Sequence, residues 1–391
     1  MSKLIRNIFN STIFSEQINN LRKEILSIPP YSSLFLLDDL KGFMSIGDDD
    51  WGKIKYTFSK NFRNYDRILY QIHQKRNAKL SKEEKQTIMK FLTIGYVISG
   101  DVRYFNEYLW IDNKYNNVFF HLNLANFKQN LIDGIHHKHP LFTKNEVHKW
   151  TEYIKSEVNK VNVKKKAMKI ALLGYPYSLK ILVDELKLLG YNFTTFYFPA
   201  HINNIKSWIL NNNILSTIYF KLKGCNFKIE KIDYLPMDNR VADVLGKGNY
   251  DLAVHKLGFI IRNNIIKCFR IGILNDHLGV LPFIRGRSTL EFSLLFGFDL
   301  GATMHIIDDG VDTGKIIAIY TYDMIKRGFR NTQDIKNLIV KDSKFRYVES
   351  IKYISDKDYI LFNNDKQKGM QYYYIHPEIV KYIDSYVIKR L

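Results

Sequence analysis

Cysteine is nearly absent, since the 391-residue sequence contains only Cys225 and Cys268. Two cysteines cannot form a disulfide framework or a four-thiolate zinc site, so a reduced, cytoplasmic setting is the simplest expectation. Glycine (21 residues) and proline (8 residues) are also scarce, which argues against a disordered or fibrous chain. No apolar run is long enough to span a bilayer, and the first residues lack the apolar core of a signal peptide.

Acidic residues are in the minority, with 39 Asp and Glu against 58 Lys and Arg, and the formal net charge is +19. A basic protein of this kind can bind nucleic acid or an anionic membrane surface. The alternative is a compositional bias towards lysine, which we favour because no dense strip of arginine and aromatic side chains occurs. A small anionic substrate fits both interpretations.

The length allows two or three domains, and the first, residues 1–160, is expected to be a mainly helical accessory domain. A capping-box pattern at 81–84 and an amphipathic pattern at 145–158 support helices there. The basic run at 159–166 is the best candidate for a linker. The histidines within 136–139 are expected to lie in a solvated loop and not to bind a metal, because a lysine separates them.

After the linker the pattern changes to short apolar runs that alternate with helical segments. The expected strands are residues 169–173, 193–198, 215–222, 227–232, 250–254 and 271–274. The expected helices are residues 179–189, 202–210 and 241–245. This alternation predicts an α/β fold with a Rossmann-like, mostly parallel sheet over residues 168–325. Residues 326–391 are expected to form a small C-terminal α+β extension.

Asn275 and His277 are the first candidates for catalysis, because Asn275 directly follows an expected strand and ligands of open α/β sheets bind at strand ends. On an extended segment both side chains point the same way. The amide can donate to a carbonyl oxygen that becomes negative, and the imidazole can accept a proton from an attacking amine. Asp312 could orient the imidazole. The alternative is two turn-capping residues and an ordinary loop histidine.

The residues that follow decide between these readings. They are Val280-Leu-Pro282, Arg285-Gly286, Gly301-Ala-Thr303 and Asp312-Thr-Gly314. Together with Asn275-x-His277, this order resembles the folate-dependent formyltransferase family, which includes glycinamide ribonucleotide, methionyl-tRNA and sugar-nucleotide N-formyltransferases. The resemblance implies 10-formyltetrahydrofolate as co-substrate and no metal. It also implies that Asn275 holds the formyl oxygen, that His277 acts as base and that Asp312 assists proton transfer.

The resemblance also implies where the substrates bind. The implied folate-binding residues are His255, Lys256, Leu257, Gly258, Phe259, Ile307, Asp308, Asp309 and Gly310. The candidate substrate-binding residues are Gly174, Tyr175, Ser178, Arg285 and Gly286. A helix that starts near Ser178 could hold an anion, and Arg285 could bind phosphate through its planar fork of donors. The alternatives are a plain tight turn at 174–178 and an arginine that bonds to carbonyl groups of its own loop.

Two residues depart from the family pattern. Leu278-Gly279 stands where small residues such as Pro-Ser are usual, which could reshape the acceptor side of the site. Asp276 adds a negative charge beside His277, and this charge is expected to favour the imidazolium form.

The acceptor is inferred by exclusion. Methionyl-tRNA formyltransferases carry a β-barrel domain after the catalytic one, and the glycinamide ribonucleotide enzymes normally have no helical domain in front. An amino-sugar nucleotide of polysaccharide biosynthesis is therefore the leading acceptor, and methionyl-tRNA or another amino-acid or peptide amine is the alternative. A formyltetrahydrofolate hydrolase and an inactive formyltransferase-like binding protein also stay open. Residues 1–160 could serve dimerisation or substrate presentation, so a homodimer is conceivable, whereas a nucleic-acid partner is less favoured.

Overall fold

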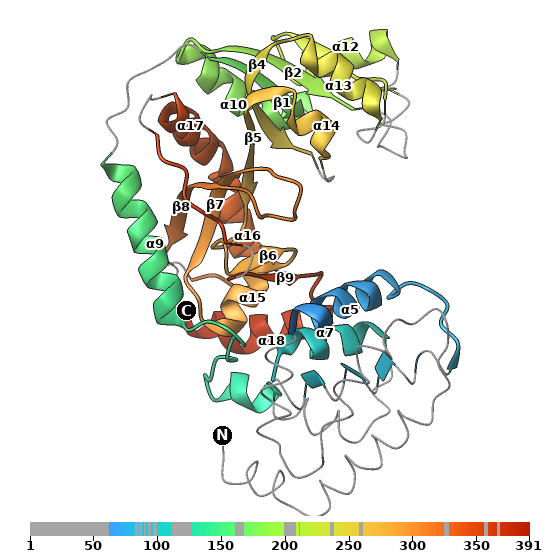
Figure 1. Ribbon diagram of the computed structural model, residues 1–391, viewed down its shortest axis with the longest axis vertical. Coiled ribbons are helices and arrows are strands. Elements are labelled where there is room, and N and C mark those ends of the chain that lie inside the picture. Colours follow the sequence, from blue (N-terminus) through green and yellow to red (C-terminus); the bar gives the residue numbers. More distant parts are fainter. Residues whose placement is uncertain are drawn as a thin grey trace, which may run out of the picture. The chain divides into compact units, whose positions relative to one another are not determined.

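The computed structural model describes residues 62–82, 85, 88–89, 91–92, 95–96, 100–111, 127–160, 168–198, 209–210, 212–234, 238–257, 261–323, 328–355, 359–365 and 368–391. These fall into two compact units (Figure 1). The first comprises Met1–Thr143 together with Tyr373–Arg390, and the second, the catalytic unit, is Lys144–Tyr372.

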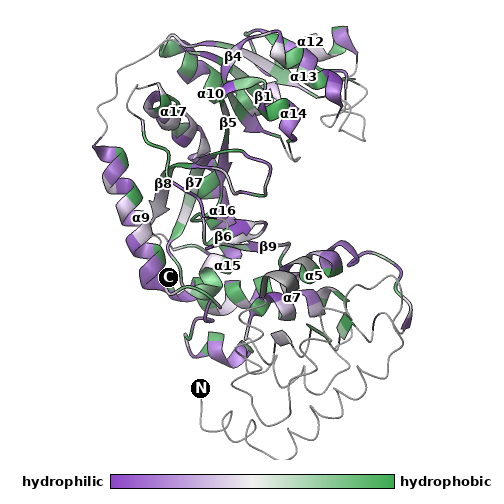
Figure 2. Ribbon diagram, viewed as in Figure 1, coloured by the Kyte–Doolittle hydropathy of each residue, from purple (hydrophilic) through white to green (hydrophobic). Residues whose placement is uncertain are grey.

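This division differs from the expected boundaries at residues 160, 168 and 325. Helix α9 (Lys144–Asn159), predicted at 145–158, belongs with the sheet, because its polar side chains bond to sheet elements. The Trp150 indole donates to the carbonyl of Leu281 at 2.9 Å, and Lys155 donates to the hydroxyl of Thr321 at 2.8 Å. Figure 2 shows α9 as largely hydrophilic, in keeping with a helix that buries a narrow face.

A seven-stranded sheet forms the centre of the catalytic unit, with the strand order β3-β2-β1-β4-β5-β7-β8. The strands are β1 (Lys169–Gly174), β2 (Asn192–Tyr197), β3 (Ile229–Lys231), β4 (Tyr250–Lys256), β5 (Phe269–His277), β7 (Leu300–Ile306) and β8 (Ile316–Tyr322). The first five in this order pair in parallel, whereas β7 and β8 are antiparallel additions. The predicted α/β fold with a mostly parallel sheet is confirmed. A second, two-stranded parallel sheet pairs β6 (Ile284–Gly286) with β9 (Met370–Tyr372).

Helices cover both faces of the large sheet. Its strands are therefore buried on both sides, and their sequences are nearly continuous apolar runs. On one face Leu172 packs with α10 (Pro176–Leu188) and α17 (Ser343–Ile354). On the other face Leu173 packs with α13 (Asn239–Gly246) and α14 (Asn263–Ile266). Among the described residues, the other labelled helices of this unit are α12 (Asn213–Leu222), α15 (Thr289–Phe296) and α16 (Thr332–Lys341).

The expectation of a strand at 215–222 is wrong, because this segment lies in α12. The side chain of Asn212 accepts hydrogen bonds from two backbone N–H groups of the first helical turn and so caps the helix. Ser216 and Phe220, one turn apart, are the buried residues. The content of isoleucine, threonine and aromatic residues suggested a strand, but the spacing of the buried positions is helical. The expected helix at 202–210 lies outside the described residues except for 209–210.

The described helices of the first unit are well packed by aromatic side chains. They include α5 (Phe62–Gln74), α7 (Val102–Ile111) and α18 (Pro377–Tyr382), which continues as one π-turn and one 3₁₀-turn to Arg390. The C-terminal segment is tied to α7 through Asn106, whose amide donates to the carbonyl of Tyr374 at 3.0 Å and accepts from the backbone N–H of His376 at 2.6 Å.

The expected loop at 136–139 is solvated only in part, since His136 and Lys138 are exposed but His137 and His139 are buried. Burial lowers the pKa of His137 to about 4 and that of His139 to about 3, so both rings are neutral. His139 accepts hydrogen bonds from the backbone N–H groups of Leu141 and Phe142. Within the described part of the chain, no three His, Cys, Asp or Glu side chains are grouped as a metal site would require. Likewise, none of the helices seen there has the length and apolar character to cross a bilayer.

Candidate active site

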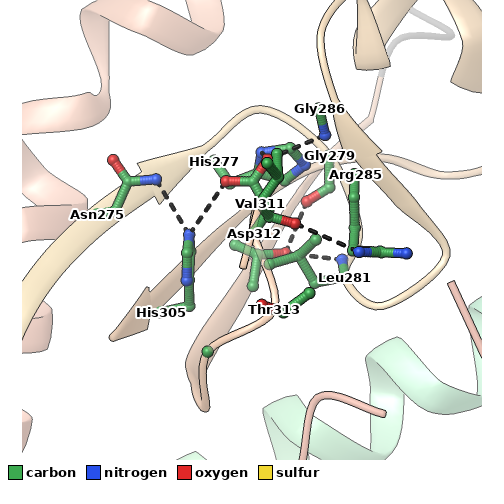
Figure 3. A network of polar contacts seen from close by, with 12 residues as sticks. Asn275, His277, Gly279, Leu281, Arg285, Gly286, His305, Val311, Asp312 and Thr313 are labelled. Carbon is green, nitrogen blue, oxygen red and sulfur yellow. Dashed lines mark hydrogen bonds and ion pairs between the residues drawn. The ribbon is translucent and has the colours of Figure 1, made fainter. Parts of the chain in front are cut away.

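Strand β5 carries Asn275 and His277, and antiparallel pairing with β7 places Asn275 opposite His305 and His277 opposite Thr303. Figure 3 shows the polar network that these residues form with Asp312. Asn275 was expected just beyond the strand, but it lies inside β5, because the pairing with β7 extends the strand to His277. The alternation of side chains along a strand then puts Asn275 and His277 on one face, as predicted.

The amide of Asn275 is oriented by two histidines. Its nitrogen lies 3.0 Å from Nε2 of His305, and its oxygen lies 3.4 Å from Nδ1 of His255. Nδ1 of His305 is 3.2 Å from the carbonyl of Ile306, so this nitrogen carries the ring proton and Nε2 accepts from Asn275. The Asn275 nitrogen has a second hydrogen, which is the donor available to a carbonyl group of a substrate.

His277 is 5% exposed, and both of its ring nitrogens face acceptors. Nε2 donates to the carbonyl of Ile284 at 2.8 Å, and Nδ1 lies 3.2 Å from a carboxylate oxygen of Asp312. Burial disfavours the charged ring, but the charge and hydrogen bond of Asp312, together with the Ile284 carbonyl, outweigh it and raise the pKa of His277. At pH values below this raised pKa, His277 is therefore an imidazolium that pairs with the ionised Asp312.

Asp312 receives hydrogen bonds from His277 and from the backbone, and His305 lies beside it. Besides His277, its carboxylate accepts from the backbone N–H of Gly286 at 2.9 Å, and its other oxygen lies 3.6 Å from Nε2 of His305. Burial alone would raise the pKa of Asp312, but the two histidines hold it well below its usual range. The backbone of Asp312 is left-handed, with φ at 52°, which is uncommon for a residue other than glycine.

Asn364 holds this unusual backbone in place, and no sequence motif pointed to it. Its amide nitrogen donates to the carbonyl of Asp312 at 3.0 Å and to that of Gly314 at 2.8 Å. His305 lies between Asn275 and Asp312 and contacts both. The only sequence signal for His305 was its alternation with Thr303 on the same strand.

Thr303 and Gly286 of the family pattern support the backbone around the cluster. The Thr303 hydroxyl donates to the carbonyl of Gly279 at 2.6 Å and accepts from the N–H of Leu281 at 3.1 Å. Gly286 has φ at 96°, and a Cβ atom there would lie 2.2 Å from the carbonyl oxygen of Tyr372. Gly286 therefore serves the close approach of β6 to β9.

Arg285 bonds to carbonyl groups, as the alternative for this residue expects, but these carbonyls lie in two other loops and not in its own. Its guanidinium donates to the carbonyls of Val311, at 3.4 Å, and Gly369, at 3.2 Å. Two loops are thereby tied to β6, and one of them ends at Asp312. The candidate phosphate-binding role of Arg285 gains no support from these contacts.

The turn at Gly174, Tyr175 and Ser178 lies at the end of β1 and the start of α10. The Ser178 hydroxyl donates to the carbonyl of Tyr175 at 2.7 Å, which is a contact within the turn. The Tyr175 ring packs on the cluster that contains Tyr197 and Phe220. Gly174 pairs with Lys256 of the neighbouring strand, so the start of the turn adjoins the implied folate site at the end of β4.

The residues of the implied folate site lie at the end of β4 and before Asp312. His255 contacts Asn275, as described above, whereas Lys256 donates to the Ser343 hydroxyl at 3.1 Å, and burial lowers its pKa. Leu257 and Ile307 pack at the edge of the core on the α13 face. Gly258 and Phe259 lie outside the described residues.

The two aspartates in the loop before Asp312, Asp308 and Asp309, make different contacts. Asp308 accepts from the backbone N–H of Gly310 at 3.1 Å and from the hydroxyl of Thr313, so it shapes the loop itself. Asp309 is exposed and accepts from the side chain of Asn263. Asp309 is therefore the loop carboxylate that is turned towards solvent.

Asp276 was expected to add charge beside His277, and the structure modifies this expectation. The carboxylate is on the opposite face of β5, where both of its oxygens bind the guanidinium of Arg346. Its charge still raises the pKa of His277, but as the smallest of the named contributions.

Comparison with known proteins agrees with this geometry. Residues 232–341 match the family model described as formyl transferase. The resemblance to the formyltransferase family is confirmed. The matched segment contains Asn275, His277, His305 and Asp312, but neither Arg346 nor Asn364.

Curated relatives match parts of the chain. The methionyl-tRNA formyltransferase of Finegoldia magna is 37% identical over 84 residues, which are 21% of this chain and 27% of that protein. The enzyme of the same name from Elusimicrobium minutum is 32% identical over 113 residues, or 29% of this chain and 31% of that protein. The chain thus spans about a third or less of the length of these relatives.

Solved structures with a similar fold cover about half of this chain. Glycinamide ribonucleotide transformylase 1 from Symbiobacterium toebii has a TM-score of 0.38 and 18% identity, over 51% of this chain and 95% of that chain. A 4-N formyltransferase from Francisella tularensis has a TM-score of 0.38 and 21% identity, over 53% of this chain and 76% of that chain. Both TM-scores lie below 0.5, so neither likeness bears on the acceptor.

Proposed function

We propose that the protein is an N-formyltransferase that moves a formyl group from 10-formyltetrahydrofolate to a primary amine by direct attack. The observation that carries this proposal is the connected set Asn275, His305, Asp312 and His277, in which an amide donor and an ion pair lie at one strand end. The formyltransferase family match over this segment supports it.

Asn275 supplies the donor for the formyl oxygen. Of its two amide hydrogens, one is accepted by His305, and the second donates to the formyl oxygen, which becomes negative as the amine adds. Because His255 and His305 fix the amide on both sides, the donor is oriented before the substrate arrives. Preorganised donors of this kind are worth roughly 10²–10³ in kcat.

His277 and Asp312 together accept the proton that the amine loses. Nε2 of His277 is committed to the Ile284 carbonyl, so Nδ1, which faces Asp312, is the proton-accepting nitrogen. The competent form has neutral His277 and ionised Asp312, and it accumulates above the raised pKa of His277. The expected kcat/KM therefore rises with pH through that pKa and then levels off, whereas a falling profile would assign activity to the imidazolium.

The folate co-substrate is proposed to bind between the end of β4 and the loop before Asp312. His255, which contacts Asn275, would place the bound folate next to the Asn275 amide. Asp308 would keep the loop before Asp312 in its conformation. The contribution of these residues is binding and orientation of the formyl group, while the bound co-substrate supplies the group itself. Replacing Asp308 by Asn should raise the KM for the folate more than it lowers kcat.

We propose an amino-sugar nucleotide as the acceptor. In this chain helices α16 and α17 follow β8, and α17 packs on the sheet, which differs from the β-barrel that follows the catalytic domain in methionyl-tRNA enzymes. Methionyl-tRNA is the second candidate, because the curated relatives carry that name and the net charge is +19. A tRNA acceptor predicts a steep loss of affinity as the salt concentration rises.

A formyl-transfer assay tests the proposal. The full-length protein is incubated with 10-formyltetrahydrofolate and, separately, with a panel of amino-sugar nucleotides or with methionyl-tRNA, and mass spectrometry detects the gain of one formyl group on the amine. Wild-type protein should formylate one acceptor class, and Asn275→Ala and His277→Ala should abolish most of the rate.

The other outcomes identify the alternatives. Release of formate without any acceptor would replace the proposal with a hydrolase. If the protein neither transfers formyl nor releases formate, and binds the folate unchanged after Asn275→Ala, the catalytic proposal fails in favour of a binding protein.

A further inference from the structure

A buried ion pair lies directly behind the candidate catalytic residues. Asp276 is the residue between Asn275 and His277 on β5, and Arg346 comes from α17. The Nε and Nη2 atoms of Arg346 donate to the two carboxylate oxygens at 2.9 Å and 2.7 Å. The side chains of Arg346 and Asp276 are 2% and 5% exposed, so the pair is almost completely removed from solvent.

Further contacts fix the pair in three directions. Arg346 also donates to the carbonyl of Ile339 at 2.9 Å and to the hydroxyl of Tyr322 on β8. The Ser343 hydroxyl donates to Asp276, and Ser343 in turn accepts from Lys256 at the end of β4. The network therefore joins the ends of β4, β5 and β8 to α16 and α17.

Stability alone does not account for such a pair. Removing two charges from water costs about as much as their attraction returns, and apolar residues of similar volume often stabilise a core equally well. What a two-pronged arginine contact adds is a fixed direction for the carboxylate. Asn275 and His277 are the neighbours of Asp276 on β5, and their side chains point to the opposite face of the sheet. Holding the Asp276 carboxylate in one direction therefore also fixes the backbone from which these two side chains project.

A second contact reaches the same site from α17. The hydroxyl of Tyr347, the residue after Arg346, donates to the carbonyl of His255 at 2.8 Å. His255 is the residue whose ring contacts the Asn275 amide oxygen. Helix α17 thus holds both sides of Asn275, through Asp276 on its own strand and through His255 on β4.

We propose that Asp276 and Arg346 form a positioning pair for formyl transfer, which sets the orientation of Asn275 and His277 from the opposite face of the sheet. The proposal rests on the proposed formyltransferase function. Neither residue is expected to touch a substrate, and Arg346 lies beyond the segment 232–341 that matches the formyl transferase family.

The test compares three variants of the full-length protein: Asp276→Asn, Arg346→Met and the double variant Asp276→Leu/Arg346→Met. Each single change leaves one buried group without its partner, so a lower Tm is expected. The double variant removes both charges, so its Tm should recover relative to the single variants. Its kcat should remain lower than that of the wild type by roughly tenfold to a hundredfold, the scale expected of a small misplacement, with little change in KM.

Arg270 and Asp251 provide a matched control, since they form a 2.7 Å ion pair between the opposite end of β5 and β4, with Arg270 exposed. Arg270→Met should leave kcat unchanged. If the double variant at Asp276 and Arg346 recovers both Tm and kcat, the pair is only structural and the positioning proposal is overturned.

A measurement that does not depend on activity separates this proposal from the proposed function. Ring resonances of isotope-labelled histidines, assigned with His277→Gln, report the environment of His277 by NMR. The double variant should shift the His277 resonance and its titration midpoint, even if no acceptor is formylated. An unchanged His277 resonance in the double variant would contradict the positioning role, whereas absence of formyl transfer by the wild type would contradict the proposed function alone.

Discussion

Replacement of Asp312 by Asn isolates the charge of this residue from its shape. Asn tolerates the left-handed backbone found at Asp312, where φ is 52°, better than most residues do. It also retains an oxygen that can accept from the N–H of Gly286, a contact of 2.9 Å in the native protein. The substitution therefore removes chiefly the negative charge that faces His277 and His305.

The size of the effect follows from the lost ion pair. A hydrogen bond to a charged group contributes about 1.5–3 kcal/mol, so removing the charge of Asp312 should lower the pKa of His277 from its raised value. Burial, which opposes the charged ring, is then offset by the smaller contributions of the Ile284 carbonyl and the Asp276 charge. Loss of the proton-accepting pair should lower kcat/KM by roughly 10²–10⁴-fold.

The assay is the pH profile of kcat/KM, combined with NMR titration of His277. The expected result is a lower plateau whose acidic limb moves to lower pH, in step with the His277 titration. Asp299→Asn is the matched control, since Asp299 pairs with the exposed His148 at 2.6 Å in the same unit. The reasoning is refuted if Asp312→Asn keeps the native rate, or if the rate falls while the acidic limb stays where it was.

Four further outcomes are expected. The pKa of His277 is raised in the folded protein, so the charged ring stabilises the fold fully below its unfolded pKa near 6.5. This stabilisation is lost as the pH rises through the folded pKa. Tm should therefore decline over that pH window in the wild type and not in His277→Gln. His305→Gln should lower kcat by freeing the Asn275 amide while leaving Tm nearly unchanged, as measured by steady-state kinetics and thermal unfolding. Thr303→Val should cost about 1–3 kcal/mol in urea unfolding, because two buried backbone groups lose their partner. Gly286→Ala should lower Tm sharply, by overpacking worth about 1–3 kcal/mol or more.

The parts of the site that the sequence predicted are those set by local order along the chain. The run of apolar strands indicated the parallel sheet, and the spacing of Asn275 and His277 followed from the alternation of a strand. Asp312 was named through its place in the ordered pattern, and the structure brings it to 3.2 Å from His277. These predictions needed no knowledge of which distant segments meet.

The residues that sequence reasoning missed are those whose role depends on tertiary contacts. Asn364 follows Asp312 by 52 positions and meets its carbonyl only because the chain folds back on the loop. Arg346 lies in a helix whose charged surface gave no hint of a buried ion pair. The error at α12 has the same origin, since tertiary packing and one Asn cap outweighed the strand preference of its β-branched residues.

The division of the chain into units has a consequence for the order of events during synthesis. The first unit contains Met1–Thr143 and Tyr373–Arg390, and Asn106 bonds to both Tyr374 and His376 across that interval. Chains emerge from the ribosome at roughly 5–20 residues per second, so the catalytic unit is made while the first unit still lacks these partners for about ten seconds or more. The helical unit is therefore completed after the catalytic unit, although its N-terminal part is made before it.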